Sequence, residues 1–160
     1  MARKKKQETV SPSEEEFRKL IPELMLWNNG RGIRVTDWIS CIGSFEHAIG
    51  YLALFWPDFI VHQGCVLLAD SGLDNFDAFA AHGPISAQMT MNHRHLDHYY
   101  FQQDPLCTKE QMVHVGRKLR AMWTAKLAME FPERTFVVTF DEDTVTLTFF
   151  ERQPGQSMIP

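Results

Sequence analysis

Residues 135–150 read TFVVTFDEDTVTLTFF and give the clearest secondary-structure signal in the chain. Polar and apolar residues alternate on both sides of the acidic turn Asp141-Glu142-Asp143. Such alternation is typical of strands with one buried and one exposed face, so the stretch predicts a β-hairpin. A second hairpin is predicted at residues 59–68, where two short apolar runs flank Gln63-Gly64, because an X-Gly pair suits a two-residue turn.

Apolar residues at helical spacing surround these two hairpins. They predict helices over residues 11–30, 36–57, 74–83, 85–100 and 108–132. The helix at 36–57 carries one formal charge between Asp37 and Asp58, so it is predicted to be the central, mostly buried helix. Because the strands are not interleaved singly with helices, the fold class is α+β: four to five helices packed with two antiparallel β-hairpins.

The length of 160 residues predicts one domain with a core of ordinary size. Residues 11–152 are assigned to this single α+β domain. The basic start at residues 1–10 is predicted to be a disordered tail, and the Pro-, Gly- and Ser-containing residues 153–160 a flexible one.

The net charge of −4 gives no electrostatic reason to bind nucleic acid. No uninterrupted apolar stretch predicts a membrane span. The three cysteines form no C-x-x-C pair, which argues against a disulfide framework and favours a reducing, cytoplasmic location. The partner expected on these grounds is a protein or a small ligand, not nucleic acid or membrane. The oligomeric state is left open.

A histidine-rich segment, HRHLDH, occupies residues 93–98 and lies downstream of GCVLLADSG at residues 64–72. The two segments resemble the opening motifs of the metallo-β-lactamase-type hydrolases. The resemblance implies that His93 and His95 hold one divalent, zinc-like metal, and that Asp97 and His98 hold a second. Asp70 then matches the upstream acidic residue that supports the histidine loop.

Helical spacing across the same segment gives a competing interpretation. Ile85, Met89, Leu96 and Tyr100 follow a helical pattern, on which residues 93 and 95 would diverge by roughly 200°. In that case the imidazoles do not converge on an ion. The resembled family supplies further metal ligands downstream of this segment. In this chain only His114 could match one of them, so no complete catalytic set is present.

Glu46 and His47 form another candidate site, in the middle of the predicted central helix. Glu46 falls at the edge of the apolar face, so its carboxylate is expected to be partly desolvated and to need a partner such as Arg31 or Arg34. The pair could anchor a ligand in a pocket. Alternatively, Glu46 forms an ion pair that ties the preceding loop to the core.

The preferred hypothesis is a non-catalytic protein that binds a protein or small ligand through an aromatic-rich surface, with no cofactor. The candidate surfaces are the hairpin edge at 144–150 and the groove beside helix 37–56. The alternatives are a metal-dependent hydrolase that uses the histidine segment, and a small enzyme or ligand carrier with a Glu46/His47 pocket.

Overall fold

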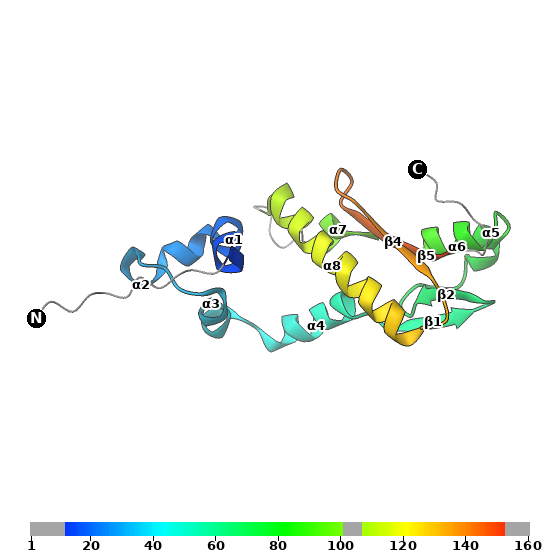
Figure 1. Cartoon of the computed structure of the whole chain (residues 1–160), viewed down its shortest axis with the longest axis horizontal. Coiled ribbons are helices and arrows are strands. Elements are labelled where there is room, and N and C mark those ends of the chain that lie inside the picture. The colour runs from blue at the N-terminus through cyan, green and yellow to red at the C-terminus, as the bar shows by residue number, and fades with distance from the viewer. Residues whose placement is uncertain (1–11, 101–106, 153–160) are drawn as a thin grey trace, which may run out of the picture. The chain divides into compact units, whose positions relative to one another are not determined.

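The computed structural model describes residues 12–100 and 107–152 and has an α+β fold (Figure 1). The chain divides into two compact units, Met1–Ala48 and Ile49–Pro160, which are described separately. The single domain predicted for residues 11–152 therefore stays a prediction, and the tails predicted at 1–10 and 153–160 lie outside the described residues. Within the described part of the chain, no helix is both long and apolar enough to span a bilayer.

The first unit contains short helices. Its elements are α1 (Pro12–Leu20), the 3-10 helix η1 (Pro22–Met25), α2 (Trp27–Gly30), α3 (Val35–Ile42) and the start of α4 (Phe45–Phe55). Pro22 divides the predicted first helix because proline cannot donate the hydrogen bond that a continuous helix needs. Asn28 and Asn29 have φ angles of 55° and 54°, as expected for residues that end a helix in the left-handed region.

The prediction of one buried helix over residues 36–57 is wrong in two respects. Gly43 has extended angles, φ −65° and ψ 147°, and separates α3 from α4. A new helix then begins, and the Ser44 hydroxyl accepts a hydrogen bond from the His47 amide at 3.4 Å. In addition, neither helix contains a buried residue. Spacing reveals an apolar face, but it does not reveal whether another element covers that face.

The second unit contains both predicted hairpins. Strands β1 (Phe59–His62) and β2 (Cys65–Leu68) pair antiparallel, with Phe59 opposite Leu68. Gln63 and Gly64 both have positive φ angles, 46° and 79°, which are the angles that a type I′ turn requires.

The C-terminal hairpin belongs to a three-stranded sheet of order β3-β5-β4. Its strands are β3 (Arg94–His95), β4 (Phe136–Asp141) and β5 (Thr146–Glu151). The Asp141 carboxylate accepts hydrogen bonds from the amides of Asp143 and Thr144, at 2.8 and 3.1 Å, and so closes the predicted acidic turn. Strand β3 was not predicted, and its presence makes β5 the central strand.

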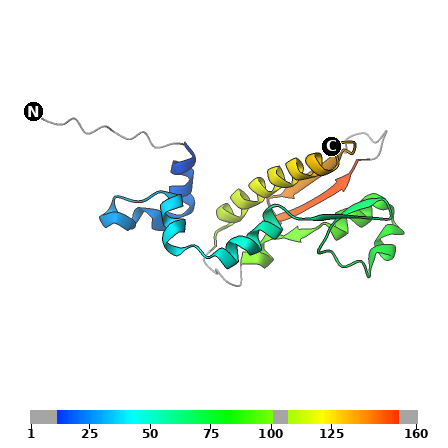
Figure 2. The ribbon, with the colours of Figure 1, turned by 90° about the horizontal axis from the view of Figure 1, so that it is seen from below.

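The long helix α8 (Lys109–Glu130) lies along the β4–β5 hairpin and supplies one side of the core (Figure 2). Thr108 caps it through a capping box with Gln111. The buried core of this layer is large and apolar; from α8 and β5 it includes Leu119, Trp123, Leu127, Leu147 and Phe149. The Trp123 ring meets Phe149 edge to face, and its indole N–H donates to the Leu54 carbonyl at 2.9 Å, which fixes the end of α4 to α8.

Helix α6 (Pro84–Met91) packs against β2 and β5, helix α5 (Phe76–Ala80) packs against α6, and α7 (Leu96–Tyr100) follows β3. The predicted continuous helix over 85–100 is wrong, because α6 ends at Met91. The buried Asn92 side chain accepts from the Leu68 amide at 2.9 Å. It also donates to the carbonyls of Val66 and Phe149, at 3.1 and 3.2 Å. These three hydrogen bonds join the two sheets and turn the chain out of the helix into β3.

Candidate functional site

The histidine segment lies where α6, β3 and α7 follow one another. His93 comes after α6, His95 is in β3, and Asp97 and His98 are in α7. Arg94 ties the segment to the loop after β2. Its guanidinium donates to the Asp70 carboxylate at 2.5 Å and to the His93 carbonyl at 2.9 Å.

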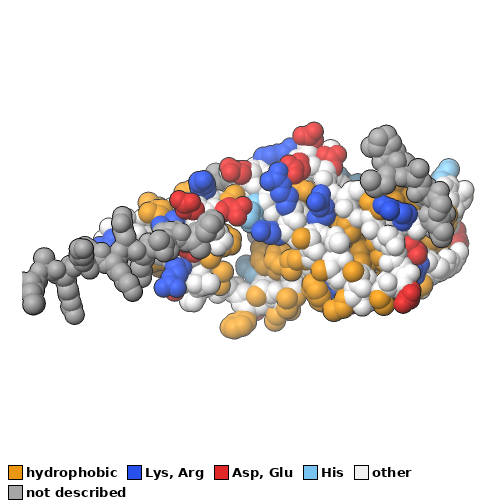
Figure 3. Space-filling model, in the orientation of Figure 1, with side chains coloured by type: hydrophobic (Ala, Val, Ile, Leu, Met, Phe, Trp, Pro, Cys, Tyr) orange, Lys and Arg blue, Asp and Glu red, His pale blue; other side chains and the backbone are white. Residues whose placement is uncertain are grey.

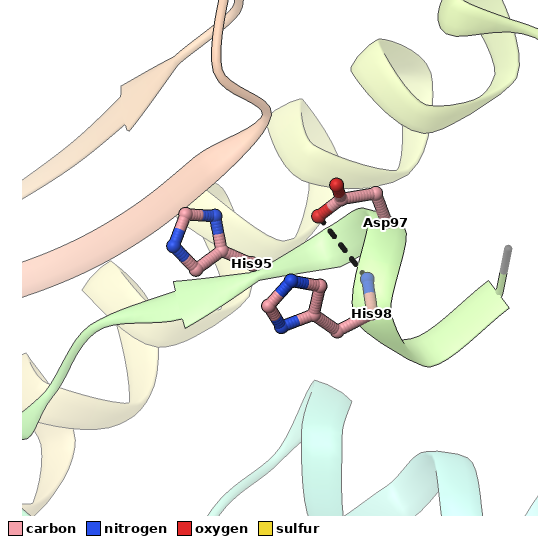
Figure 4. Close-up of side chains that lie close together, drawn as sticks. All are labelled: His95, Asp97 and His98. Atoms are coloured by element: carbon pink, nitrogen blue, oxygen red, sulfur yellow. Dashed lines mark hydrogen bonds between the residues drawn. The ribbon is translucent and has the colours of Figure 1, made fainter.

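This arrangement brings the histidine side chains together instead of scattering them. The His95 ring centroid lies 4.4 Å from that of His93 and 4.8 Å from that of His98. Ligand atoms of His95, Asp97 and His98 all lie within 4.8 Å of one another (Figure 4). Within residues 12–100 and 107–152, this is the one group of three such side chains close enough to share a metal ion.

Pairing with β5 positions His95, a contact that was not predicted from the sequence. His95 lies opposite Thr146, and His95 Nδ1 is 3.3 Å from the Thr146 hydroxyl oxygen. That hydroxyl donates to the Thr144 carbonyl at 3.2 Å, so its oxygen is left to accept a hydrogen from Nδ1. The contact therefore favours the tautomer of His95 whose free lone pair is on Nε2.

The surroundings of His93 favour its neutral form. The pKa of His93 is lowered, first by burial and then by the neighbouring His95, Arg94 and His98. A lowered pKa keeps the imidazole neutral over a wider range of pH, and the neutral ring is the form that donates a lone pair.

The metal pairs implied by the sequence resemblance differ from the grouping in the structure. The resemblance paired His93 with His95, and Asp97 with His98, whereas the group that converges is His95, Asp97 and His98. Asp70 does support the segment, through its ion pair with Arg94. The segment follows helix α6, whereas in the resembled family it follows a strand.

Glu46 and His47 lie in the first turn of α4, and both are exposed. The partial burial predicted for Glu46 is therefore wrong. The two residues do not line either of the described surface grooves, one beside α6 and one beside the end of α4. A ligand site at Glu46 and His47 stays a prediction.

An exposed apolar face runs along the part of α4 that belongs to the second unit. Ile49, Leu52 and Trp56 expose 67%, 61% and 40% of their surface. Their spacing of three and four residues places them on one side of the helix. Figure 3 shows hydrophobic side chains gathered along the lower edge of the molecule, over α4. A groove of about 330 Å³ adjoins this face, lined in part by Leu52, Trp56 and Asp70.

The hairpin edge at 144–150, the other candidate surface, is covered. Strand β3 pairs with its first part, at Thr146 and Leu147. Beyond β3, the Asn92 amide donates to the Phe149 carbonyl, and the Gln88 side chain accepts from the Glu151 amide at 3.1 Å. Two side chains thus replace a neighbouring strand, so this edge does not offer its backbone to a partner.

The α4 face and the histidine cluster are therefore the two features of the described residues that suggest a role. Neither can be interpreted through a relative. Comparison of this chain with models of protein families, with curated proteins and with solved structures finds no match.

Proposed function

We propose that the protein is a non-catalytic binding protein, and that it binds another protein through the face of α4 formed by Ile49, Leu52 and Trp56. The observation that carries this proposal is the exposure of these three large apolar side chains on one side of a helix. Each such side chain contributes about 1.5–3 kcal/mol when it is removed from water. Contiguous apolar surface of this kind marks interaction sites in folded proteins.

The chemistry around the face indicates the kind of partner. Asp58 and Asp70 both line the adjoining groove, and their carboxylates remain largely exposed although each contacts one cation, Lys126 or Arg94. A basic side chain from a partner could share these carboxylates. We therefore propose an amphipathic helix as the occupant, with apolar residues against α4 and a Lys or Arg toward the two aspartates.

Leu52→Ser tests this proposal, because it removes the central side chain of the face without disturbing the buried core. Met129→Ser is the matched control, since Met129 is an equally exposed apolar residue on α8. Wild type and both variants are used to recover partners from the same extract, and recovered proteins are quantified by mass spectrometry. We expect one protein whose recovery falls at least tenfold with Leu52→Ser, a loss of about 1.4 kcal/mol, and is unchanged with Met129→Ser.

Binding of the recovered protein must also depend on the negative charge of the groove. Its affinity should weaken with Asp58→Asn and with increasing salt, because exposed ion pairs are screened. Equal recovery by Leu52→Ser and Met129→Ser would contradict the proposal. So would light scattering that shows a wild-type dimer dissolved by Leu52→Ser, because the face would then be covered by a second copy of this chain.

The two alternative functions have less support among the described residues. A hydrolase of the resembled type uses two metals, whereas one convergent ligand group is found in residues 12–100 and 107–152. A carrier with a Glu46/His47 pocket needs an enclosed site, whereas both side chains are exposed on α4.

A further inference from the structure

We infer that His95, Asp97 and His98 form a binding site for one divalent transition-metal ion, of the zinc type, at the junction of β3 and α7. This site shares no ligand residue with the proposed protein-binding face and does not depend on it. It also differs from the hydrolase hypothesis, because it requires one metal and no catalysis.

The geometry allows all three side chains to reach one ion. Two ligand atoms bound to a tetrahedral zinc ion at about 2.1 Å lie roughly 3.4 Å apart. Ligand atoms of the three residues already lie within 4.8 Å of one another. Rotation of the side chains can close the remaining gap, so the strand and the helix need not move.

Hydrogen bonds around the cluster orient two of the proposed ligands, His95 and Asp97. The Thr146 hydroxyl oxygen lies 3.3 Å from His95 Nδ1 and so orients the His95 ring, as hydrogen bonds to ligand imidazoles do in known metal sites. The Asp97 carboxylate accepts from the backbone amide of His98 at 3.1 Å, which holds it beside the imidazole of that residue (Figure 4).

Charge in the neighbourhood is also compatible with a cation. Arg94 precedes His95 in the chain, and its guanidinium is paired with Asp70 and also donates to the His93 carbonyl. The Asp97 carboxylate offsets part of the charge of a divalent ion.

The donor set determines the class of metal. Two imidazoles and one carboxylate suit zinc, iron, cobalt or nickel, whereas magnesium prefers oxygen ligands alone. Three protein ligands leave at least one coordination position for water. His93, whose ring lies beside His95, is near enough to influence that position but is not needed to form the site.

Metal titration of the full-length, untagged protein after dialysis against a chelator tests the inference. Binding of Zn²⁺ is measured by competition with a chromophoric chelator, and Co²⁺ reports the coordination through its visible absorption. We expect one equivalent of Zn²⁺ with a Kd below about 10 µM, and no competition from millimolar Mg²⁺. His98→Asn and Asp97→Asn should each weaken Zn²⁺ binding at least tenfold. His82→Asn, which changes an exposed histidine outside the cluster, should leave it unchanged.

Thr146→Val tests whether the Thr146 hydroxyl positions His95 for metal binding or only contributes to the stability of the fold. It should weaken Zn²⁺ binding about tenfold and change the tautomer of His95 seen in the nitrogen NMR spectrum of its ring, whereas Thr139→Val on β4 should do neither. Circular dichroism of each variant shows whether it is folded. Absence of stoichiometric Zn²⁺ binding by the wild type would overturn the inference, as would equal weakening by His98→Asn and His82→Asn in folded protein.

Discussion

Replacing Asn92 with alanine should lower the free energy of unfolding by about 3–5 kcal/mol, the largest effect that we expect from one substitution outside the apolar core. Asn92 is completely buried and makes three hydrogen bonds to backbone groups of β2 and β5. Alanine would leave the Leu68 amide and the Val66 and Phe149 carbonyls without this partner. Each buried polar group left unsatisfied costs about 1–3 kcal/mol. Urea unfolding followed by circular dichroism measures the change.

Hydrogen exchange shows whether the loss arises at the junction of the two sheets. Amides of residues 65–68 and 147–151 should exchange faster in Asn92→Ala than in wild type. Thr90→Ala, on the exposed side of α6, is the matched control and should change stability by less than about 0.5 kcal/mol. A loss below about 1 kcal/mol for Asn92→Ala would show that the amide does not join the sheets.

The hairpins could be predicted from the sequence, whereas the convergence of the histidine side chains could not. Asn92 shows why. The β1–β2 and β4–β5 hairpins depend on local features, which are alternating polarity and a turn at Gln63-Gly64 or Asp141–Asp143. Local features are visible in the sequence. The end of α6 depends on Asn92 bonds to residues 24, 26 and 57 positions away. The spacing of apolar residues does not identify hydrogen-bond partners that are so far apart in the sequence.

The α4 segment shows a second limit of sequence periodicity. The spacing of its apolar residues correctly indicated a helix with an apolar face. Burial of that face was predicted because only one formal charge interrupts it, yet Ile49 and Leu52 are exposed. A low charge density is compatible with burial in the chain's own core and with burial against a partner.

The candidate metal site depends on local sequence and on long-range contacts. The resemblance to the metallo-β-lactamase-type motif implied His93, His95, Asp97 and His98 as possible ligands, whereas the structure brings His95, Asp97 and His98 together. Their convergence depends on β3, a strand of two residues that exists because it pairs with β5. A strand this short has no recognisable pattern of its own, so Thr146, 51 positions from His95, could not be identified as its neighbour.

Replacing Gly116 with alanine should lower the free energy of unfolding by about 2 kcal/mol, although alanine favours helix by about 1 kcal/mol over glycine. Gly116 is buried in the middle of α8, against the ring of Phe140 on β4. A Cβ atom at this position would overlap three ring atoms, with Cε1 at 2.6 Å. Either the ring must leave its place or α8 must move away from the sheet, and both lose packing. Thermal and urea unfolding measure the effect.

Phe140→Ala reveals whether the ring is the cause. In that background, Gly116→Ala should become stabilising by up to about 1 kcal/mol, because the overlap is gone and the helix preference remains. Gly50→Ala provides the matched control in wild type: Gly50 is also in a helix, nothing lies within 4 Å of its Cβ position, and we expect a gain of about 0.5–1 kcal/mol. If Gly116→Ala were as stabilising as Gly50→Ala, α8 could not lie as close to β4 as the Gly116–Phe140 contact requires. The reversal of sign between the two backgrounds is therefore the result that ties this glycine to the packing of α8 on the sheet.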